Sequence, residues 1–436
     1  MRRRPRSTLW FDRMETSLML EQIEGSQAVA RAVAMCRPEV ISAYPISPQT
    51  HIVESLSDMV RTGDLSPCEY LMVESEFGAM SACIGASAAG ARTFTATSSQ
   101  GLLFMAEALY NASGLGLPIV MTVANRAIGA PINIWNDHSD AMSQRDSGWI
   151  QLFAESNQEA VDLHVQAFRL AELLSVPVMV CMDGFILTHA VEQVELPEQA
   201  QVDAFLPPFE PRQMLDPAEP VTIGAMVGPE AFTEVKYLMH AKQVQALDEI
   251  PRIANDFEEV FGRASGGLVQ PYRTDDAETI VVALGSVLGT IEDVVDTLRD
   301  EGIRIGALGI KCFRPWPINE VREALAGAVR VVVLEKAFAV GAGGIVGQNT
   351  RMALTGLPNT VYNVVAGLGG RPITRQSLRT LFDDVIGDRI DSASLYFLDL
   401  DKELVERELA RPSSGRPGPH AENMLRDLGS IGSGSH

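Results

Sequence analysis

Residues 71–100 of the chain read LMVESEFGAMSACIGASAAGARTFTATSSQ, an apolar run, two glutamates and then a series of small residues. The apolar run is typical of a β-strand. The small residues over 77–90 predict a helix that another backbone or a flat ligand can approach closely. Glu76 would lie in its first turn, where the positive end of the helix dipole favours a carboxylate. Burying a carboxylate among close neighbours is costly, so Glu76 is a candidate functional residue.

The two glutamates of this stretch have competing interpretations. Glu76 is either a solvated residue that the helix dipole favours or a buried catalytic carboxylate. Glu74 lies two residues earlier and competes for the same role. The spacing is compatible with one buried and one exposed carboxylate, and both interpretations stay open at this point.

Strands and helices alternate on both sides of this stretch. Alternation of this kind predicts a parallel sheet covered by helices on both faces, with functional groups at the carboxyl ends of the strands. The expected strands span residues 40–43, 71–73, 93–96, 119–123 and 176–181, and the expected helices span residues 51–60, 77–90, 102–113 and 158–174.

A second and smaller α/β unit is expected from about residue 279 onward. Residues 197–220 are proline-rich and acidic with extended character, and a helical pattern over 234–261 follows them. The strands of the second unit are expected at residues 280–284, 305–310, 329–334 and 361–365, with helices at 288–301 and 318–326.

The predicted fold class is therefore α/β with two domains. We expect the larger domain over residues 14–265 and the smaller one over 272–410. Residues 1–13 are basic but lack the apolar core of a signal peptide, so we interpret them as a disordered extension. Residues 411–436 contain many serines, glycines and prolines, and we expect a flexible tail there.

Composition excludes several classes of protein. A formal net charge of -21 argues against nucleic-acid binding and is typical of a solvated acidic surface, although an electropositive partner would also fit it. The sequence contains no run of about 18 apolar residues, so it predicts no membrane span. Because no two cysteines form a C-x-x-C pair, we expect no zinc site or iron–sulfur cluster within this chain and a cytoplasmic location. The five cysteines are Cys36, Cys68, Cys83, Cys181 and Cys312.

Common cofactor and nucleophile motifs are missing. The glycine-rich segment GAGGIVG at 341–347 does not have the G-x-G-x-x-G spacing of dinucleotide-binding proteins. The chain also has no P-loop, no H-E-x-x-H and no G-x-S-x-G. We therefore set aside nicotinamide enzymes, P-loop enzymes, zincins and α/β-hydrolases.

Two further segments carry candidate functional groups. The turn YPISPQT at 44–50 places two hydroxyls and an amide after the first expected strand, and its prolines fix the backbone. Arg126 follows the strand at 119–123, where a guanidinium can hold a small carboxylate through two parallel hydrogen bonds. An ion pair of Arg126 with Asp137, Asp140 or Glu155 is the equal alternative. Residues 124–155 form a long polar connection, which usually serves a site or an interface.

Together these segments resemble the α subunit of pyruvate:ferredoxin oxidoreductase in its multi-subunit form. The similarity extends over about residues 23–379. The segments that carry it are YPISPQT at 44–50, VESEFGAMSACIGASAAGARTFTATSSQGL at 73–102, ANRAIGAP at 124–131, NDHSD at 136–140, QRDSGW at 144–149, DGFILTH at 183–189, FRPWP at 313–317 and GLGGR at 367–371.

The resemblance implies a thiamine-diphosphate enzyme that decarboxylates a 2-oxoacid, transfers the acyl group to coenzyme A and reduces ferredoxin or flavodoxin. It implies a pyrimidine-binding domain and a transketolase-C-like domain in this chain. The family's G-D-G motif for diphosphate and Mg²⁺ and its cluster cysteines are missing here. They are expected on a β subunit that carries Mg²⁺ and a [4Fe-4S] cluster. Further γ and ferredoxin-like δ subunits, a dimer of heteromers and an inactive isolated α chain are also implied.

The resemblance also implies roles for individual residues. Glu76 matches the glutamate that binds N1′ of the aminopyrimidine and so promotes loss of the proton at C2 of the thiazolium. Arg126 matches the arginine that binds the substrate carboxylate, and Ser47 matches a substrate-binding threonine of the family. Other contacts are implied for Pro45, Ile46, Ser98 and Gln100 with the cofactor, and an ordering role for Asp137 and His138.

Two departures from the family pattern bear on the substrate. Ser47 keeps the hydroxyl of the usual threonine but lacks its methyl group, and Pro372 stands where the family often has aspartate. A compact polar site favours pyruvate over a branched-chain 2-oxoacid or oxalate. For 2-oxoglutarate a second cation would be needed, and Arg145 is the candidate for it. Outside the enzyme class, the alternative is a non-catalytic scaffold subunit, which the intact Glu76 and Arg126 argue against.

Overall fold

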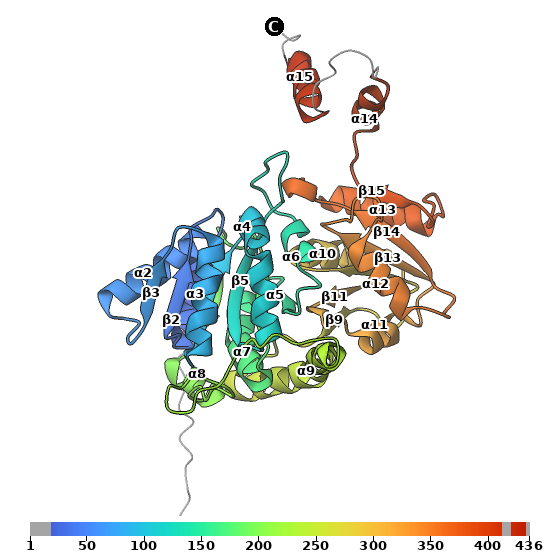
Figure 1. The fold of residues 1–436 in the computed structure, drawn as a ribbon. Helices are drawn as coiled ribbons and strands as arrows, with labels where there is room; N and C mark the ends of the chain where they lie inside the picture. Colours follow the sequence, from blue (N-terminus) through green and yellow to red (C-terminus); the bar gives the residue numbers. More distant parts are fainter. Residues whose placement is uncertain (1–18, 412–419, 433–436) are drawn as a thin grey trace, which may run out of the picture.

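The computed structural model describes residues 19–411 and 420–432, and its first part is built around a seven-stranded sheet (Figure 1). The strand order is β12-β6-β7-β5-β4-β2-β3, and all neighbouring strands are parallel except β12, which runs antiparallel to β6. The strands are β2 (Val40–Ala43), β3 (Glu69–Met72), β4 (Thr93–Thr97), β5 (Ile119–Asn125), β6 (Ile150–Phe153), β7 (Val178–Asp183) and β12 (Cys312–Arg314).

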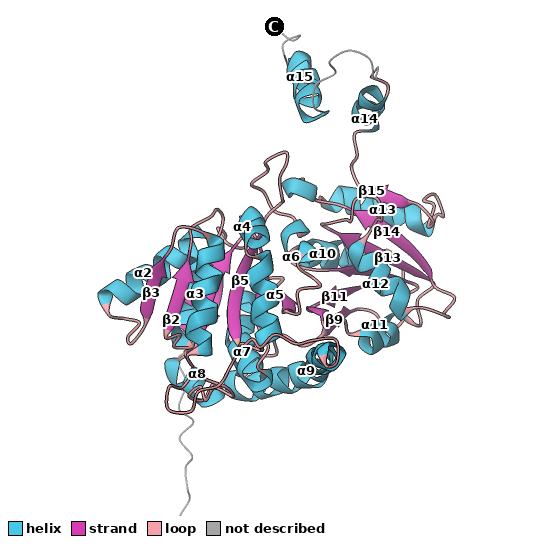
Figure 2. Cartoon of the chain, in the orientation of Figure 1, coloured by secondary structure: helices cyan, strands magenta, loops and turns pink. Residues whose placement is uncertain are grey.

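Helices cover both faces of this sheet, which confirms the predicted α/β class. Helices α1, α2 and α7 share one apolar core with the sheet, and α3, α4 and α5 share a second one (Figure 2). Every residue of β4, β5 and β7 is buried, as expected for central strands of a parallel sheet. The helices are α1 (Gly25–Met35), α2 (Thr50–Thr62), α3 (Glu76–Ala88), α4 (Ser99–Phe104), α5 (Ala106–Leu115), α6 (Ser139–Ser143) and α7 (Asn157–Leu174).

Several expectations for this part were wrong in detail. The helix predicted over 102–113 is divided at Met105 into α4 and α5. The polar connection 124–155 contains α6 and the fully buried strand β6. The segment 197–220, expected to be extended, includes helix α8 (Gln199–Phe205). A two-stranded antiparallel sheet of β1 (Met19–Glu24) and β8 (Val191–Leu196) was not predicted.

The second part forms a six-stranded sheet in the order β15-β14-β13-β10-β11-β9. Only β9 is antiparallel to its neighbour. Its strands are β9 (Val269–Tyr272), β10 (Thr279–Ala283), β11 (Ile305–Ile310), β13 (Arg330–Glu335), β14 (Thr360–Val365) and β15 (Leu395–Phe397), and its helices are α10 (Val287–Asp300), α11 (Ile318–Leu325), α12 (Ile345–Ala353) and α13 (Arg375–Ile386).

The two sheets are joined more closely than the predicted domain limits indicate. Strand β12 follows β11 in sequence but pairs with β6 of the first sheet. Residues of both parts also share one apolar core, for example Phe153 with Phe313. The long helix α9 (Phe232–Phe261) runs along the base of the molecule in Figure 1 and precedes the second sheet.

The C-terminal residues depart from the expected flexible tail. Helix α14 (Lys402–Leu409) is followed by helix α15 (His420–Gly432), and Figure 1 shows both standing apart from the two sheets. The tail prediction is therefore wrong for residues 420–432. The disordered extension expected over 1–13 lies outside the described residues. Among the residues that were described and searched, no helix is long and apolar enough to cross a membrane.

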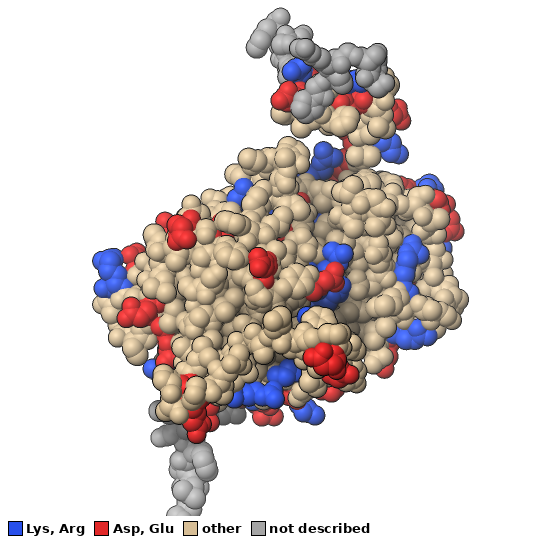
Figure 3. Space-filling view, viewed as in Figure 1, with Lys and Arg blue, Asp and Glu red and all other residues tan. Residues whose placement is uncertain are grey.

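One face of the first part carries few charged side chains. Figure 3 shows acidic and basic groups scattered around a broad uncharged area over α3, α4 and α5. The exposed large apolar side chains of strand β3 and of helices α3, α4 and α5 are Leu71, Met72, Phe77, Phe104 and Tyr110. Such a face is typical of a contact with another protein.

The buried Lys311, which follows strand β11 of the second part, forms ion pairs with the first part of the molecule. Its Nζ lies 2.7 Å from Glu155 and 2.8 Å from Glu159, and its side chain is 1% exposed. Burial raises the pKa of Glu159, while the charge of Lys311 lowers it. The ion pair of Lys311 with Glu159 therefore stabilises the fold only when both residues are present, since a buried charge without its counter-ion is costly.

We predict that Lys311→Met lowers the free energy of unfolding by about 3–5 kcal/mol at neutral pH. In this variant the pKa of Glu159 in the folded state lies above its unfolded value, so the stability deficit shrinks as the pH falls and Glu159 takes up a proton. Urea unfolding followed by circular dichroism measures both effects. The exposed Lys402→Met is the control, and an equal loss in both variants would contradict the assignment.

Candidate functional site

The carboxyl ends of four parallel strands bring the predicted site residues to one edge of the first sheet. This edge is where open α/β sheets bind ligands. The turn with Ser47 follows β2, Glu76 follows β3, Ser98 and Gln100 follow β4, and Arg126 follows β5.

Glu76 is the buried member of the glutamate pair. Ser75 begins helix α3 as its N-cap, with Oγ accepting a hydrogen bond of 3.1 Å from the Gly78 N–H. Glu76 is 7% exposed, whereas Glu74 is exposed. Within residues 19–411 and 420–432, Glu76 has no hydrogen bond or ion pair. A buried carboxylate without a partner requires an explanation, because its desolvation is otherwise uncompensated.

Gly101 in helix α4 makes room for the Glu76 carboxylate. A Cβ added at Gly101 would lie 2.7 Å from Glu76 Oε1 and 2.5 Å from Thr97 Oγ1, so a larger residue would displace one of them. The Thr97 hydroxyl is buried and also has no hydrogen-bond partner in the described part of the chain. The carboxylate and the hydroxyl therefore lie close together as two unsatisfied polar groups.

Arg126 does not form the ion pair that was its alternative. Its Nη1 donates to the Ser47 carbonyl at 2.9 Å, and its Nε donates to the Asn133 carbonyl at 3.3 Å. The guanidinium has no carboxylate partner among the described residues, so the alternative ion pair with Asp137, Asp140 or Glu155 is wrong. Burial lowers the pKa of Arg126, while the negative charge of the nearby Asp140 raises it.

Asp140 holds the backbone of the site together, a role that was not predicted; the sequence suggested only an ion pair with Arg126 as an alternative. Its carboxylate accepts hydrogen bonds from the Ser99, Arg126 and Ala141 N–H groups and from Asn125 Nδ2, at 2.7–3.0 Å. Burial raises the pKa of Asp140 to about 6, and these donors act in the opposite direction. The signal in the sequence was its place in the segment NDHSD, and the structure puts it in the first turn of the short helix α6.

The remaining predicted contacts occupy the walls of the same edge. Ser47 is exposed beside Arg126, and Gln49 Nε2 holds the turn by donating to the Tyr44 carbonyl at 2.9 Å and the Ala96 carbonyl at 3.1 Å. The Ser98 hydroxyl donates to the Ala124 carbonyl at 2.7 Å, and the Ser98 carbonyl accepts from the Gly101 N–H at 2.9 Å. Two further predicted residues, Pro45 and Ile46, are half-buried, and Gln100 Oε1 accepts from the Ser99 hydroxyl.

Asp137 and His138 connect the site loop to the second part of the molecule. Asp137 Oδ2 accepts a hydrogen bond of 3.1 Å from Gly369 N–H. His138 Nε2 lies 2.7 Å from Asp183 Oδ1, and Lys336 Nζ lies 2.9 Å from Asp183 Oδ2. Burial alone would raise the pKa of Asp183, but Lys336 and His138 lower it well below its usual value.

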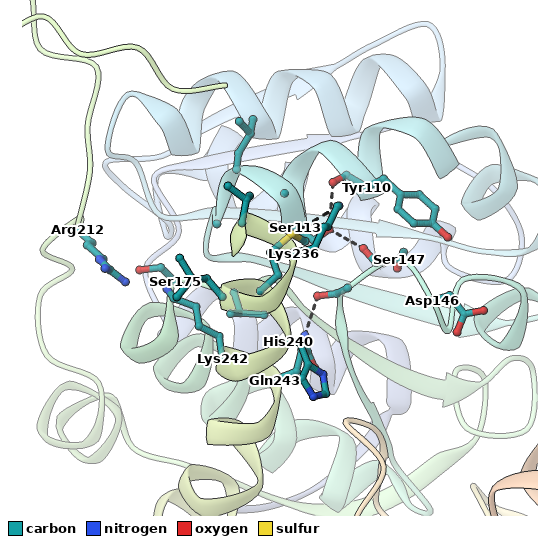
Figure 4. A pocket seen from close by; sticks show the side chains of 18 of the residues that line it. Tyr110, Ser113, Asp146, Ser147, Ser175, Arg212, Lys236, His240, Lys242 and Gln243 are labelled. Carbon is teal, nitrogen blue, oxygen red and sulfur yellow. Dashed lines mark hydrogen bonds between the residues drawn. The ribbon is translucent and has the colours of Figure 1, made fainter. Parts of the chain in front are cut away.

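Two large cavities lie away from this edge. Figure 4 shows the first, of about 460 Å³, between α5, the end of α7 and α9, where Lys242 Nζ donates to the Leu174 carbonyl at 2.6 Å. The second, of about 530 Å³, is lined by Arg145, Arg314 and Trp316. Neither is lined by Glu76, Ser47 or Arg126. Arg145 was the candidate for a second substrate-binding cation, but it lines a cavity that does not include Glu76, Ser47 or Arg126.

Comparison with known proteins shows the family of the chain. Residues 31–255 match the family model described as pyruvate flavodoxin/ferredoxin oxidoreductase, thiamine diphosphate-binding, and residues 277–378 match pyruvate:ferredoxin oxidoreductase core domain II. Pyruvate synthase subunit PorA of Methanosarcina barkeri is 49% identical over 88% of this chain and 97% of its own length. PorA of Methanothermobacter thermautotrophicus is 47% identical over 82% of this chain and 93% of its own length.

A solved structure supports the fold. The 2-oxoglutarate:ferredoxin oxidoreductase of Magnetococcus marinus superposes with a TM-score of 0.65 at 20% identity, over 84% of this chain and 65% of that longer chain. At this identity the likeness concerns the fold alone. With the two family matches and full-length relatives above 45% identity, the chain belongs to the pyruvate:ferredoxin oxidoreductase family as a pyruvate synthase subunit of the PorA type.

Proposed function

We propose that this chain supplies one half of the thiamine-diphosphate site of pyruvate synthase, with Glu76 binding the aminopyrimidine and Arg126 binding the 2-oxoacid carboxylate. The observation that carries the proposal is the Glu76 carboxylate, which is 7% exposed and has no protein partner among the described residues. A donor from another molecule would satisfy it, and N1′ of the aminopyrimidine is such a donor when it is protonated.

The residues at this edge fit the pyrimidine half of the cofactor. Glu76 and Thr97 leave two buried polar groups unsatisfied, and the small residues of α3 and Gly101 leave space for a flat ring. When bound, thiamine diphosphate supplies the carbon nucleophile and the electron sink for decarboxylation. Glu76 holds a proton at N1′ in this arrangement, which is general acid–base chemistry. The G-D-G motif for diphosphate and Mg²⁺ is missing from the sequence, so we assign it to a β subunit.

Arg126 is arranged to receive the substrate carboxylate. The carbonyls of Ser47 and Asn133 fix the guanidinium, and its remaining N–H groups can form a bidentate pair with a carboxylate. The exposed Ser47 hydroxyl beside it can donate to the 2-oxo group. Because Arg145 lines a different cavity, the arrangement favours pyruvate over 2-oxoglutarate, whose second carboxylate would lack a cation there.

The uncharged face around the site supports a partner subunit. Phe77, which follows Glu76 in sequence, and Phe104 are 37% and 58% exposed, with ring centroids 6.2 Å apart. We assign this face to the β subunit that carries Mg²⁺ and the [4Fe-4S] cluster. The proposal also includes coenzyme A as co-substrate, γ and δ subunits, a dimer of heteromers, ferredoxin as acceptor and a cytoplasmic location.

We predict that Glu76→Gln in the assembled complex slows hydrogen–deuterium exchange at C2 of thiamine diphosphate by about 10²–10⁴-fold, because the proton shuttle is lost. Cofactor binding should remain, since the amide keeps the shape of the side chain. Proton NMR of the quenched complex measures the exchange. The control is Glu74→Gln, which removes the exposed neighbouring carboxylate; full exchange in Glu76→Gln contradicts the role.

Replacing Arg126 with alanine should lower kcat/KM for pyruvate by about 10²-fold or more, because a charge-assisted pair worth about 3 kcal/mol is lost. The free energy of unfolding should fall by only about 1 kcal/mol. Arg126→Lys keeps the charge but not the fork, so it should restore activity only in part. Steady-state kinetics with Arg145→Ala as the control measures this, and equal losses at both arginines would refute the assignment.

The partner proposal predicts that the purified chain alone reduces no electron acceptor with pyruvate. It also predicts that the double variant Phe77→Asp/Phe104→Asp binds the β subunit at least about tenfold more weakly, because aromatic side chains contribute strongly to protein interfaces. Sedimentation of mixed subunits measures the affinity. Leu173→Asp is the matched control, since Leu173 is 56% exposed on helix α7. Unchanged assembly of the double variant would place the β subunit on another face.

A further inference from the structure

Three potential metal ligands meet at a place that the proposed function does not use. Glu24 ends strand β1, His51 lies in the first turn of α2, and His189 lies between β7 and β8. One ligand atom from each lies within 4.8 Å of the others. His51 Nδ1 is 2.6 Å from Glu24 Oε1, and the two imidazole centroids are 4.8 Å apart.

The backbone holds Glu24 and His189 next to each other. Glu24 pairs with Val191 in the antiparallel ladder of β1 and β8. The next residues continue the connection, since Gly25 N–H donates to the Ala190 carbonyl at 3.0 Å and Ser26 N–H donates to the Thr188 carbonyl at 2.9 Å. Main-chain pairing therefore sets the distance between Glu24 and His189, so the two residues are already close before a metal binds.

The orientation of His189 leaves one ring nitrogen available. Its Nδ1 is hydrogen-bonded to Thr188 Oγ1 at 2.8 Å, and the same Oγ1 accepts a hydrogen bond of 2.8 Å from Phe185 N–H. A hydrogen bond at one ring nitrogen fixes the tautomer and directs the other nitrogen to a metal, which is the usual arrangement around histidine ligands. In the tautomer whose Nδ1–H donates to Thr188 Oγ1, the lone pair of Nε2 is left for a metal.

We propose that Glu24, His51 and His189 form a binding site for a divalent transition metal of the zinc class. Two imidazoles and one carboxylate, with water in the open position, are a common ligand set for Zn²⁺. Imidazole ligands favour Zn²⁺, Co²⁺ and Ni²⁺ over Mg²⁺ and Ca²⁺, so the site is distinct in chemistry from the Mg²⁺ site assigned to the β subunit.

The geometry requires only side-chain movement to close around an ion. In a tetrahedral site with metal–ligand distances of about 2.0–2.1 Å, ligand atoms lie about 3.3 Å apart. The observed spread of up to 4.8 Å therefore has to shrink by rotation of side chains. The His51 side chain is 47% exposed and the Glu24 side chain 20% exposed, so both have room to rotate.

A bound metal would join segments that border the catalytic edge. His51 lies four residues after Ser47, and the Phe185 ring makes tilted contacts with the rings of His189 and Trp135, at centroid distances of 4.8 and 4.9 Å. Gly184 also packs against the same turn, because a Cβ there would lie 2.6 Å from Pro48 Cγ. Metal binding should therefore fasten the Ser47 turn to the loop that begins at Asp183.

Titration of the untagged full-length chain with Co²⁺, followed by its visible absorption, tests the site. We expect the intense d–d bands of tetrahedral Co²⁺ at one equivalent, their loss on adding Zn²⁺, and no effect of excess Mg²⁺. His51→Gln and His189→Gln should abolish the bands, whereas His240→Gln, at an exposed histidine of α9, should not change them.

Two further measurements distinguish a specific metal site from nonspecific metal binding at the surface. Thr188→Val should weaken Zn²⁺ binding in calorimetry by about 10–100-fold and Thr188→Ser should preserve it, because the hydroxyl orients His189. Zn²⁺ should raise the thermal midpoint of the wild type but not of His189→Gln. Binding that is unaffected in His51→Gln/His189→Gln, or the absence of tetrahedral Co²⁺ bands in the wild type, would overturn the proposal.

Discussion

The four hydrogen bonds accepted by the Asp140 carboxylate hold the site together. They join the start of α4, the end of β5 and the start of α6, three segments that otherwise meet only at the edge of the sheet. Because Asp140 accepts a hydrogen bond from the Arg126 backbone N–H, the Arg126 guanidinium is held by two carbonyls and forms no ion pair among the described residues. A structural carboxylate thus positions the backbone of a cation that can bind substrate.

A second constraint is that the site is only half built. Glu76 and Thr97 are unsatisfied within the described chain, and the face around them exposes phenylalanines and few charges. An exposed apolar face and a buried polar group without a partner would both be unfavourable in an isolated subunit. Both costs disappear if a cofactor and a second subunit cover the same edge, which is the arrangement that the family membership leads us to propose.

Much of this arrangement followed from the sequence because it depends on local patterns. Strand β2 coincides with the predicted residues 40–43, β4 was recognisable from its β-branched and aromatic residues, and β5 from its apolar ones. Strand β6 was missed because IQLF is a short run whose burial depends on pairing with β7 and with the distant β12. The ion pair considered for Arg126 failed for a similar reason, since sequence spacing did not show that Asp140 accepts backbone N–H groups. Contacts between remote segments, such as His51 with His189, depend on the assembled topology and leave no periodic signal.

The central claim is that Glu76 faces N1′ of thiamine diphosphate across an interface with another subunit. A structure of this chain assembled with its β subunit and thiamine diphosphate tests it most directly. The account predicts a Glu76 carboxylate oxygen about 2.6–3.0 Å from N1′, with Phe77 and Phe104 covered by the β subunit. A structure in which Glu74 or a carboxylate of the β subunit binds N1′, with Glu76 left without a ligand, would contradict it.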